Sequence, residues 1–233
     1  MFHKSAAAFL LVTLFAGLTG LAVASGPVDS TAADANAAVP INCVYPLATC
    51  PVSGNDLPEG EDAVIRVIDG REVRFCCEMC VIKFEGAKDK YWSKIDAEII
   101  AQQLPLYPLT QCVVEPDDSL FADDEDMGVN VVYGNRLARF CCKGCIKDFK
   151  KEPAKYLTMI DAAAIEQQRK DYPLTTCVVG GDELGKMGEP VDVIVGGRLI
   201  RLCCDRCEAK LRASPAHYIA MVDQARAKGA KGN

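Results

Sequence analysis

The sequence predicts an α+β protein built from three tandem copies of one small ββα(α) module. The first observation behind this prediction is a repeat, because three sequence features recur in the same order along the chain. They are a YPL segment that ends in cysteine, a pair of adjacent cysteines followed by a third, and an aromatic segment that ends in aspartate. The second observation is that a β-rich run precedes each cysteine pair and a helical pattern follows it. The cysteine segments read RFCCEMC at 74–80, RFCCKGC at 139–145 and RLCCDRC at 201–207.

A β-hairpin is expected to follow a polar loop at the start of each module. The first strands are predicted at 63–68, 129–133 and 191–195. A two-residue turn comes after each of them, and these turns are Asp69-Gly70, Gly134-Asn135 and Gly196-Gly197. Such residues tolerate the positive φ that tight hairpin turns require. The second strand then runs into the cysteine pair from Arg71, Arg136 or Arg198.

Two helices are expected after each hairpin. The third cysteine of each segment stands four residues before a large apolar residue, which places the two on one helix face. These pairs are Cys80 with Phe84, Cys145 with Phe149 and Cys207 with Leu211. A second helix is predicted near Pro153 and Pro215, because proline is favoured at the first helical position; the first module has no such proline. The modules are predicted at 43–104, 105–170 and 171–233.

The N-terminal residues predict an exported protein. Lys4 precedes an apolar run at 6–18, and Ala22-Val23-Ala24 has the small residues of a cleavage site, which is the layout of a secretory signal peptide over residues 1–24. The apolar run is short for a bilayer span, so we expect no membrane span after cleavage. Residues 25–42 are rich in alanine, aspartate and proline without periodicity, which predicts a flexible leader. The expected location is periplasmic or secreted.

Composition and missing motifs exclude several classes of function. The net charge is −6, and there is no basic stripe with interleaved aromatic residues, so we expect no nucleic-acid partner. We find no Ser–His–Asp set, no phosphate-binding glycine loop and no paired-carboxylate motif, so we expect no enzymatic activity. The acidic segment 115–126 lacks the spacing of a calcium loop, which favours a solvated loop. The expected partners are metal ions and a metal-handling or envelope protein.

Twelve of the thirteen cysteines form three sets of four, and Cys43 stands outside the repeat. Each set has a loop cysteine after YPL, then a strand-end cysteine and a paired cysteine that are adjacent, and finally a helix cysteine. In that order the sets are Cys50, Cys76, Cys77 and Cys80; Cys112, Cys141, Cys142 and Cys145; Cys177, Cys203, Cys204 and Cys207. With only two histidines in the chain, a mixed cysteine–histidine site cannot occur in every module.

Thiolates that converge from two backbone segments suit a soft ion, either tetrahedral Zn²⁺ or Cu(I). The strand-end and paired cysteines can bind together only if the strand-end cysteine is not yet helical, because adjacent helical residues diverge by about 100°. A helix N-terminus also lowers the pKa of a thiol and favours the thiolate. We therefore predict that the twelve cysteines supply the ligands, three or four in each module, that each module holds about one zinc or copper(I) ion, and that the protein stores, buffers or delivers such ions.

Three alternatives remain open at this stage. In an exported protein the clusters can be disulfides: adjacent cysteines are too close for an unstrained bond, but Cys50 can pair with a cluster member and Cys77 with Cys80. The modules can instead be zinc-stapled units that bind another protein, since units of about fifty residues usually need such a staple. The CxxC pairs can also perform thiol–disulfide chemistry.

Three arginines stand two residues before the cysteine pairs and have two interpretations. They are Arg74, Arg139 and Arg201. They either offset the negative charge of a thiolate-rich site or belong to a solvated strand face.

The first module resembles the YHS and TRASH group of small cysteine-rich modules, through YPLATCPVSGNDL and GREVRFCCEMCVIKFEGAKDKYW. The TRASH pattern of one cysteine, a gap and C-x3-C maps onto the loop, strand-end and helix cysteines of every module. The resemblance implies a treble-clef-like fold and the binding, sensing or trafficking of copper or zinc. CPVSG occurs only in the first module, the gap is longer than usual, and Leu202 and Leu211 replace the usual phenylalanines. The fourth ligand and the metal stay open.

Overall fold

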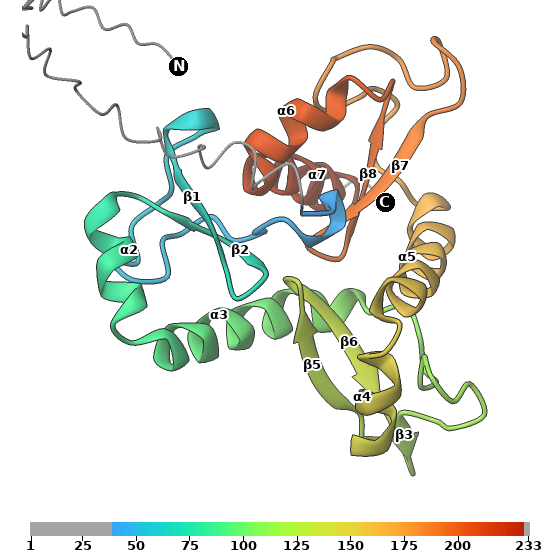
Figure 1. Ribbon diagram of the computed structural model, residues 1–233. Helices are drawn as coiled ribbons and strands as arrows, with labels where there is room; N and C mark the ends of the chain where they lie inside the picture. The colour runs from blue at the N-terminus through green and yellow to red at the C-terminus, as the bar shows by residue number, and fades with distance from the viewer. Residues whose placement is uncertain (1–38, 231–233) are drawn as a thin grey trace, which may run out of the picture. The chain divides into compact units, whose positions relative to one another are not determined.

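The computed structural model describes residues 39–230. The predicted signal peptide and most of the predicted leader therefore lie outside the described residues. In the described part the same order of elements occurs three times, a two-stranded antiparallel hairpin followed by two helices (Figure 1). The predicted α+β class is confirmed. None of the helices in residues 39–230 has the length and apolar character that crossing a membrane requires.

The three modules use equivalent elements. The first contains β1 (Val64–Ile68), β2 (Arg71–Phe75), α2 (Glu78–Glu85) and α3 (Lys88–Gln103). The second contains β5 (Val129–Tyr133), β6 (Arg136–Phe140), α4 (Lys143–Phe149) and α5 (Pro153–Arg169). The third contains β7 (Val191–Val195), β8 (Arg198–Leu202), α6 (Cys207–Ala213) and α7 (Pro215–Ala230). The shorter elements are the 3-10 helices η1 (Ile41–Cys43), η2 (Gly60–Asp62) and η3 (Leu104–Leu106), and the small hairpin of β3 (Phe121–Ala122) and β4 (Glu125–Asp126).

The main hairpins share one register and one kind of turn. The pairing sets Val64 opposite Phe75, and the equivalent residues of the other two hairpins face each other in the same way. Both residues of every predicted turn have positive φ, which is the conformation of the type I′ turn that matches the twist of paired strands. The turn residue Asn135 also holds the first two modules together, since its Nδ2 donates to the carbonyls of Cys43 at 3.1 Å and Glu72 at 2.8 Å.

Each module has an apolar core next to its cysteine cluster. In the first, the ring of Phe84 meets Phe75 and Trp92 edge-on, with centroids 5.3 and 5.0 Å apart, and stacks on Tyr91. Phe149 occupies the same place in the second module, and the fully buried Leu211 does so in the third. The helix cysteine of each module is buried on the same face as this residue. The predicted spacing of four residues on one helix face is confirmed.

A repeated ion pair ties each hairpin to the second helix of its own module. The first residue of the second strand is an arginine, and it pairs with an aspartate of that helix. The pairs are Arg71 with Asp96 at 2.8 Å, Arg136 with Asp161, and Arg198 with Asp223 at 3.1 Å. The recurrence of this pair explains why the aspartate closes the aromatic segment of every repeat.

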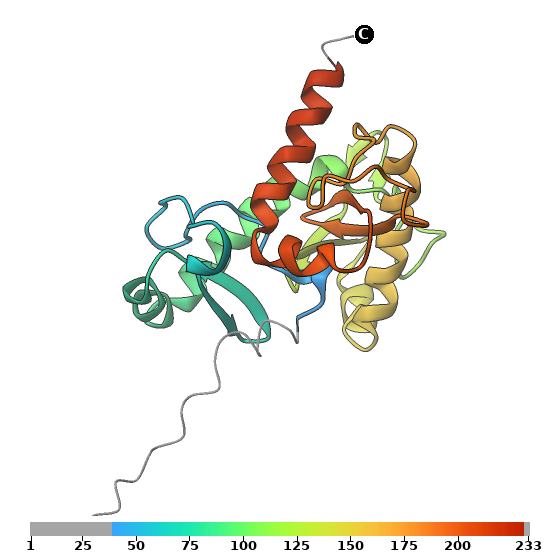
Figure 2. The ribbon, with the colours of Figure 1, turned by 90° about the horizontal axis from the view of Figure 1, so that it is seen from above.

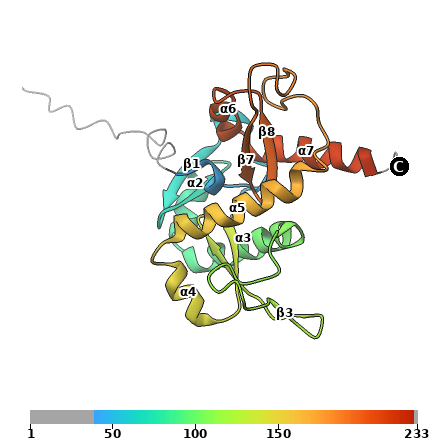
Figure 3. The ribbon, with the colours of Figure 1, turned by 90° about the vertical axis from the view of Figure 1, so that its right-hand side faces the viewer.

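Buried glutamines link each module to the next one. Gln103, the last residue of α3, donates from Nε2 to the carbonyl of Asn135 at 2.9 Å and accepts from the N–H of Leu137 at 3.0 Å. Gln168 in α5 makes the same two bonds to the β7–β8 hairpin, at 2.8 and 2.9 Å. In α7 the corresponding residue is Ala230, and the C-terminal turns of that helix extend beyond the other elements (Figures 2 and 3).

The described end of the predicted leader and the first residues of the first module are packed against the second and third modules. Val39 and Cys43 belong to the core cluster of the second module, and Val44 belongs to that of the third. The carbonyl of Val39 also accepts a hydrogen bond from Arg212 of α6 at 2.6 Å. The segment 39–44 thus contacts residues that lie far from it in the sequence.

Candidate metal centres

The loop cysteines occupy one repeated turn. The backbone N–H of Cys50 donates to the carbonyl of Asn55 at 2.8 Å, and Cys112 and Cys177 make the same bond to Asp118 and Asp182. An isolated β-bridge closes each loop next to this bond. All three loop cysteines are at most 1% exposed. Because the backbone is held on both sides, the sulfur of each loop cysteine has a fixed position relative to the hairpin.

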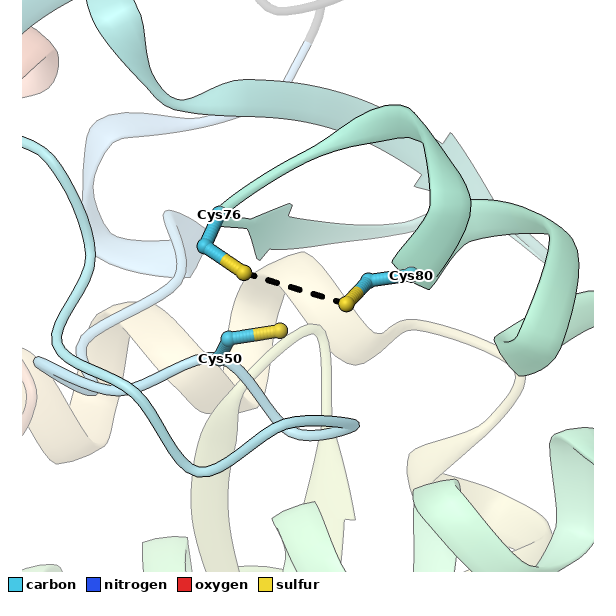
Figure 4. Close-up of side chains that lie close together, drawn as sticks. All are labelled: Cys50, Cys76 and Cys80. Carbon is cyan, nitrogen blue, oxygen red and sulfur yellow. Dashed lines mark hydrogen bonds between the residues drawn. The ribbon is translucent and has the colours of Figure 1, made fainter.

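The strand-end and helix cysteines come from consecutive elements. Cys76 directly follows β2, and Cys80 lies in the first turn of α2. Their Sγ atoms are 3.8 Å apart, and the sulfur of Cys50 approaches both from the loop (Figure 4). The equivalent strand-end to helix distances are 3.5 Å in the second module and 3.6 Å in the third. Each strand-end cysteine lies outside the helix, as the prediction of convergent ligands requires.

Three sulfurs of each module form a triad whose atoms all lie within 4.8 Å of one another. The triads are Cys50, Cys76 and Cys80; Cys112, Cys141 and Cys145; Cys177, Cys203 and Cys207. Nine of the twelve predicted ligands are therefore brought together in groups that can hold a metal ion.

The sulfur spacing agrees with metal coordination. A zinc–sulfur bond of about 2.3 Å gives a distance of about 3.8 Å between two sulfurs of a tetrahedral site. The measured distances of 3.5–3.9 Å within the triads lie close to this value. All thirteen cysteines are free thiols in the structure. The donor set is soft and suits zinc or copper(I), and it does not distinguish between them.

The paired cysteines lie next to the triads. The Sγ of Cys77 is 3.7 Å from that of Cys80 and 4.0 Å from that of Cys76, and the Sγ of Cys142 is 3.6 Å from that of Cys145. Both Cys77 and Cys142 are exposed and occupy the N-cap position of a helix. In the third module the helix begins later, at its helix cysteine, and the paired cysteine is half-buried.

Hydrogen bonds favour the thiolate form of the loop cysteines. Burial opposes the ionisation of Cys50, but hydrogen bonds from the Ser53 hydroxyl and from nearby backbone N–H groups outweigh it and lower its pKa to about 7. Burial likewise opposes ionisation at Cys112 and Cys177, and backbone N–H groups again outweigh it and lower both pKa values. Converging N–H groups of this kind form an anion-binding nest. Each triad thus contains one thiol that ionises readily.

The other triad thiols hold their protons more tightly. Burial raises the pKa of each helix cysteine to about 12, and these are Cys80, Cys145 and Cys207. Burial also raises the pKa values of the strand-end Cys141 and Cys203. Because metal binding requires the thiolate, an entering ion must displace these protons.

Two of the arginines before the cysteine pairs are buried, and all three pair with carboxylates. Arg74 and Arg139 are each 3% exposed, so they do not form a solvated strand face. Arg74 pairs with the buried carboxylate of Glu72 at 2.8 Å, and Arg139 and Arg201 each pair with an aspartate. A buried guanidinium needs a carboxylate partner and satisfied N–H groups. Their charge is therefore balanced by carboxylates and not by the thiolates.

The group beside the strand-end sulfur differs between modules, and sequence analysis missed this. In the first module the Ser53 hydroxyl lies 3.4 Å from the Sγ of Cys76. In the second, a carboxylate oxygen of Asp118 lies 3.2 Å from the Sγ of Cys141. In the third, Gly180 lies beside the strand-end Cys203, where a Cβ would come within 3.0 Å of the sulfur. The available signal was the spacing, since 28 residues separate the first two cysteines of the second set and 25 do so in the others.

Cys43 belongs to none of the triads. It is 6% exposed, and burial raises the pKa of its thiol to about 11. Its sulfur lies against the turn residue Gly134, where a Cβ would come within 3.1 Å of it. Among the described residues Cys43 is therefore a packed apolar side chain between modules.

Comparisons of the chain with protein-family models, with curated proteins and with solved structures found no match. The functional conclusion therefore depends on the geometry of the triads.

Proposed function

We propose that the protein binds soft heavy-metal ions, zinc or copper(I), one in each module, and stores, buffers or delivers them. The observation that carries this proposal is the threefold recurrence of a sulfur triad on the same elements with nearly the same spacing. Three like sites in one chain provide binding capacity, whereas a catalytic protein needs only one reacting centre. The proposed activity is binding without a chemical reaction.

The cysteines of one cluster are buried to different degrees, and this supports a site whose ion exchanges with solvent. In the first module the paired Cys77 is exposed, Cys76 is half-buried, and Cys50 and Cys80 are buried. Neighbouring sulfurs along this series are 4.0 and 3.8 Å apart. An ion can therefore pass from solvent to the triad by replacing one thiolate with the next. The loop thiolate, with its lowered pKa, then holds the ion while the helix cysteine loses its proton.

Residues 1–24 and the repeated motifs support two further parts of the proposal. The signal-peptide-like sequence favours export to the periplasm or the medium, and the motif resemblance favours assignment to the YHS and TRASH group. N-terminal sequencing of the protein from cell fractions tests the first part. A mature chain that begins at Ser25 and is found outside the cytoplasm is the expected result, and an uncleaved cytoplasmic chain would contradict it.

Metal titration tests the central proposal. The reduced, metal-free chain is titrated with zinc and with copper(I) against a chromophoric chelator, and the loaded protein is analysed for metal and free thiols. We expect about one ion per triad and protection of the triad thiols from alkylation. Cys112→Ser should remove one ion per chain, and Cys43→Ser is the matched control that should remove none. Absence of tight binding would refute the proposal.

A structural role for zinc is a second candidate function, with protein interaction as the activity. It is favoured by the burial of each helix cysteine on the same helix face as the core residue four positions on. Chelation distinguishes the two functions. A structural site resists exchange and its module unfolds when the ion is removed, whereas a handling site exchanges and leaves the circular dichroism spectrum folded.

Thiol–disulfide chemistry is a third candidate, favoured by the 3.7 Å separation of the Cys77 and Cys80 sulfurs in a CxxC segment. Trapping with an alkylating reagent in cells tests it. Thiols that cycle between reduced and oxidised forms would favour the redox function. Thiols that become reactive only after metal removal would favour metal binding.

A further inference from the structure

The modules differ in the loop residue that touches the strand-end sulfur, and this difference bears on metal preference. We propose that Asp118 is a fourth ligand of the second triad, so that the second module forms a three-sulfur, one-oxygen site selective for Zn²⁺. The inference rests on the proposed function, because it assumes that the triads bind ions. The inference adds a fourth ligand, Asp118, that makes the second site different from the other two.

The backbone holds Asp118 beside the triad. Its carbonyl accepts the N–H of the loop cysteine Cys112 at 2.8 Å, and its own N–H donates to the carbonyl of Glu115 at 3.0 Å. Since both ends of the residue are fixed, its carboxylate reaches the strand-end sulfur with little loss of conformational freedom. Holding a ligand in place before the ion arrives favours binding.

The sulfur–oxygen distance between Cys141 and Asp118 is close to the distance expected when both groups bind one zinc ion. The thiol of Cys141 donates to Oδ2 of Asp118 at a sulfur–oxygen distance of 3.2 Å. Zinc bonds of about 2.3 Å to sulfur and about 2.0 Å to oxygen give a tetrahedral sulfur–oxygen distance of about 3.5 Å. A zinc ion can therefore replace the thiol proton and bind both groups after a shift of a few tenths of an ångström.

Charge and ligand softness make this site selective. Zn²⁺ accepts carboxylate oxygen together with thiolate sulfur, whereas Cu(I) prefers sulfur alone. With three thiolates and one carboxylate, a zinc site carries a net charge of about −2 and a copper(I) site about −3, by formal charges. The larger uncompensated charge is harder to hold in a partly buried site. The carboxylate thus disfavours copper(I) both through its hard oxygen ligand and through the negative charge that it adds.

The other two modules lack an equivalent contact. The first offers the neutral Ser53 hydroxyl, 3.4 Å from its strand-end sulfur. In the third, Asp182 accepts the N–H of the loop cysteine as Asp118 does, but its carboxylate makes no hydrogen bond to a triad sulfur within residues 39–230. These two modules keep sulfur-only triads, which suit copper(I) better than the second one does.

The competing fourth ligand is the paired cysteine Cys142, whose sulfur lies 3.6 Å from that of Cys145. A four-sulfur site would lack the preference for zinc that the carboxylate provides. The experiment must therefore distinguish an oxygen ligand from a sulfur ligand at one site among three.

Cadmium NMR of the full chain makes this distinction, because each bound cadmium ion gives its own resonance and the chemical shift rises with the number of sulfur ligands. We expect Asp118→Asn to move one resonance only, and to weaken one zinc equivalent by about 10- to 100-fold in chelator competition. Asp117→Asn, a neighbouring carboxylate in the same loop, is the matched control and should change neither quantity. Cys142→Ala should leave the same resonance in place.

A reciprocal variant tests the inference by gain of a ligand. Ser53→Asp places a carboxylate beside the strand-end sulfur of the first triad. We expect a second resonance to move in the direction of a mixed sulfur–oxygen site, together with tighter zinc binding and weaker copper(I) binding there. A circular dichroism spectrum like that of the parent chain shows that the variant is folded.

The outcomes separate this inference from the proposed function. If one resonance moves with Cys142→Ala and none moves with Asp118→Asn, the fourth ligand is sulfur and the inference is wrong. If three ions bind and Asp118→Asn changes neither shift nor affinity, the inference again fails while metal binding stands. If the parent chain binds no ion, both fail.

Discussion

Gln103 provides a direct test of how the modules hold together. Its side chain is 4% exposed and bonds to both the carbonyl of Asn135 and the N–H of Leu137, in the hairpin of the next module. Leucine at this position has a similar size and keeps the helix, but it can neither donate nor accept. The substitution Gln103→Leu therefore removes one polar link between the modules and leaves the bonds of the Asn135 side chain to Cys43 and Glu72 in place.

The expected loss of stability follows from the two groups left without partners. Asn135 and Leu137 are each 1% exposed, so water cannot replace the glutamine. A buried polar group without a partner costs about 1–3 kcal/mol, so two of them cost about 2–6 kcal/mol. The additional apolar surface of leucine offsets about 1 kcal/mol. We expect Gln103→Leu to lower the free energy of unfolding by about 1–5 kcal/mol.

Urea unfolding of the reduced, metal-free chain, followed by circular dichroism, measures this loss. The matched control is Gln102→Leu, which removes only an exposed hydrogen bond to Glu98 and should change stability by less than about 0.5 kcal/mol. Gln168→Leu should destabilise the chain at least as much, because Gln168 makes the same two bonds one module later and its Oε1 also accepts a hydrogen bond from Arg226 at 2.8 Å. If Gln103→Leu proves no more destabilising than its control, the buried Gln103 bonds do not contribute to holding the modules together.

Three other outcomes are expected. With free zinc at a hundred times Kd, each triad should add about 2.7 kcal/mol to the free energy of unfolding; Cys177→Ser should remove one such increment, measured by urea unfolding with and without zinc. Ser53→Ala removes a hydrogen bond that favours the Cys50 thiolate, so the pKa of Cys50 should rise from about 7. Zinc binding to the first module should then weaken near pH 7, where the Cys50 thiol now keeps its proton. It should stay unchanged at a pH above the pKa of Cys50 in both the parent chain and the variant. Ultraviolet thiolate absorbance measures the pKa, and chelator competition measures zinc binding. Phe84→Ala should cost about 3–5 kcal/mol in urea unfolding, because its buried ring contacts three other rings.

Local sequence patterns were sufficient to predict the repeat unit. The turns could be predicted because Asp69-Gly70 and its two equivalents are residues that accept positive φ, and the structure has positive φ at all of them. The helix face could be predicted because a cysteine and a large apolar residue four positions apart must share it. Both inferences need only neighbouring residues, which is why they hold in each copy.

Contacts between distant residues could not be predicted in the same way. Arg74 looked like a strand residue near the thiolates, but its charge is balanced by Glu72, and its N–H groups reach carbonyls at the end of α6. Gln103 carries no sequence signal for its bonds to a turn more than thirty residues away. Asp118 was one carboxylate among several in an acidic segment until the fold placed it against Cys141. Each of these roles depends on pairing across the fold.

In each centre the three sulfurs depend on residues that must stay constant, whereas the residue beside the strand-end sulfur can vary. The three sulfurs depend on a hairpin end, a helix start and a closed loop, and all of these also support the core, so a change there affects folding as well as binding. The neighbour of the strand-end sulfur is different, because Ser53 and Asp118 are exposed and contribute nothing to the apolar clusters. Exposed positions of this kind tolerate substitution with little change in stability. Under the proposed metal binding, copies of one module can therefore acquire different metal preferences through one exposed loop residue, which lies three positions after the loop cysteine in the first module and six after it in the second. The triad and the fold remain the same.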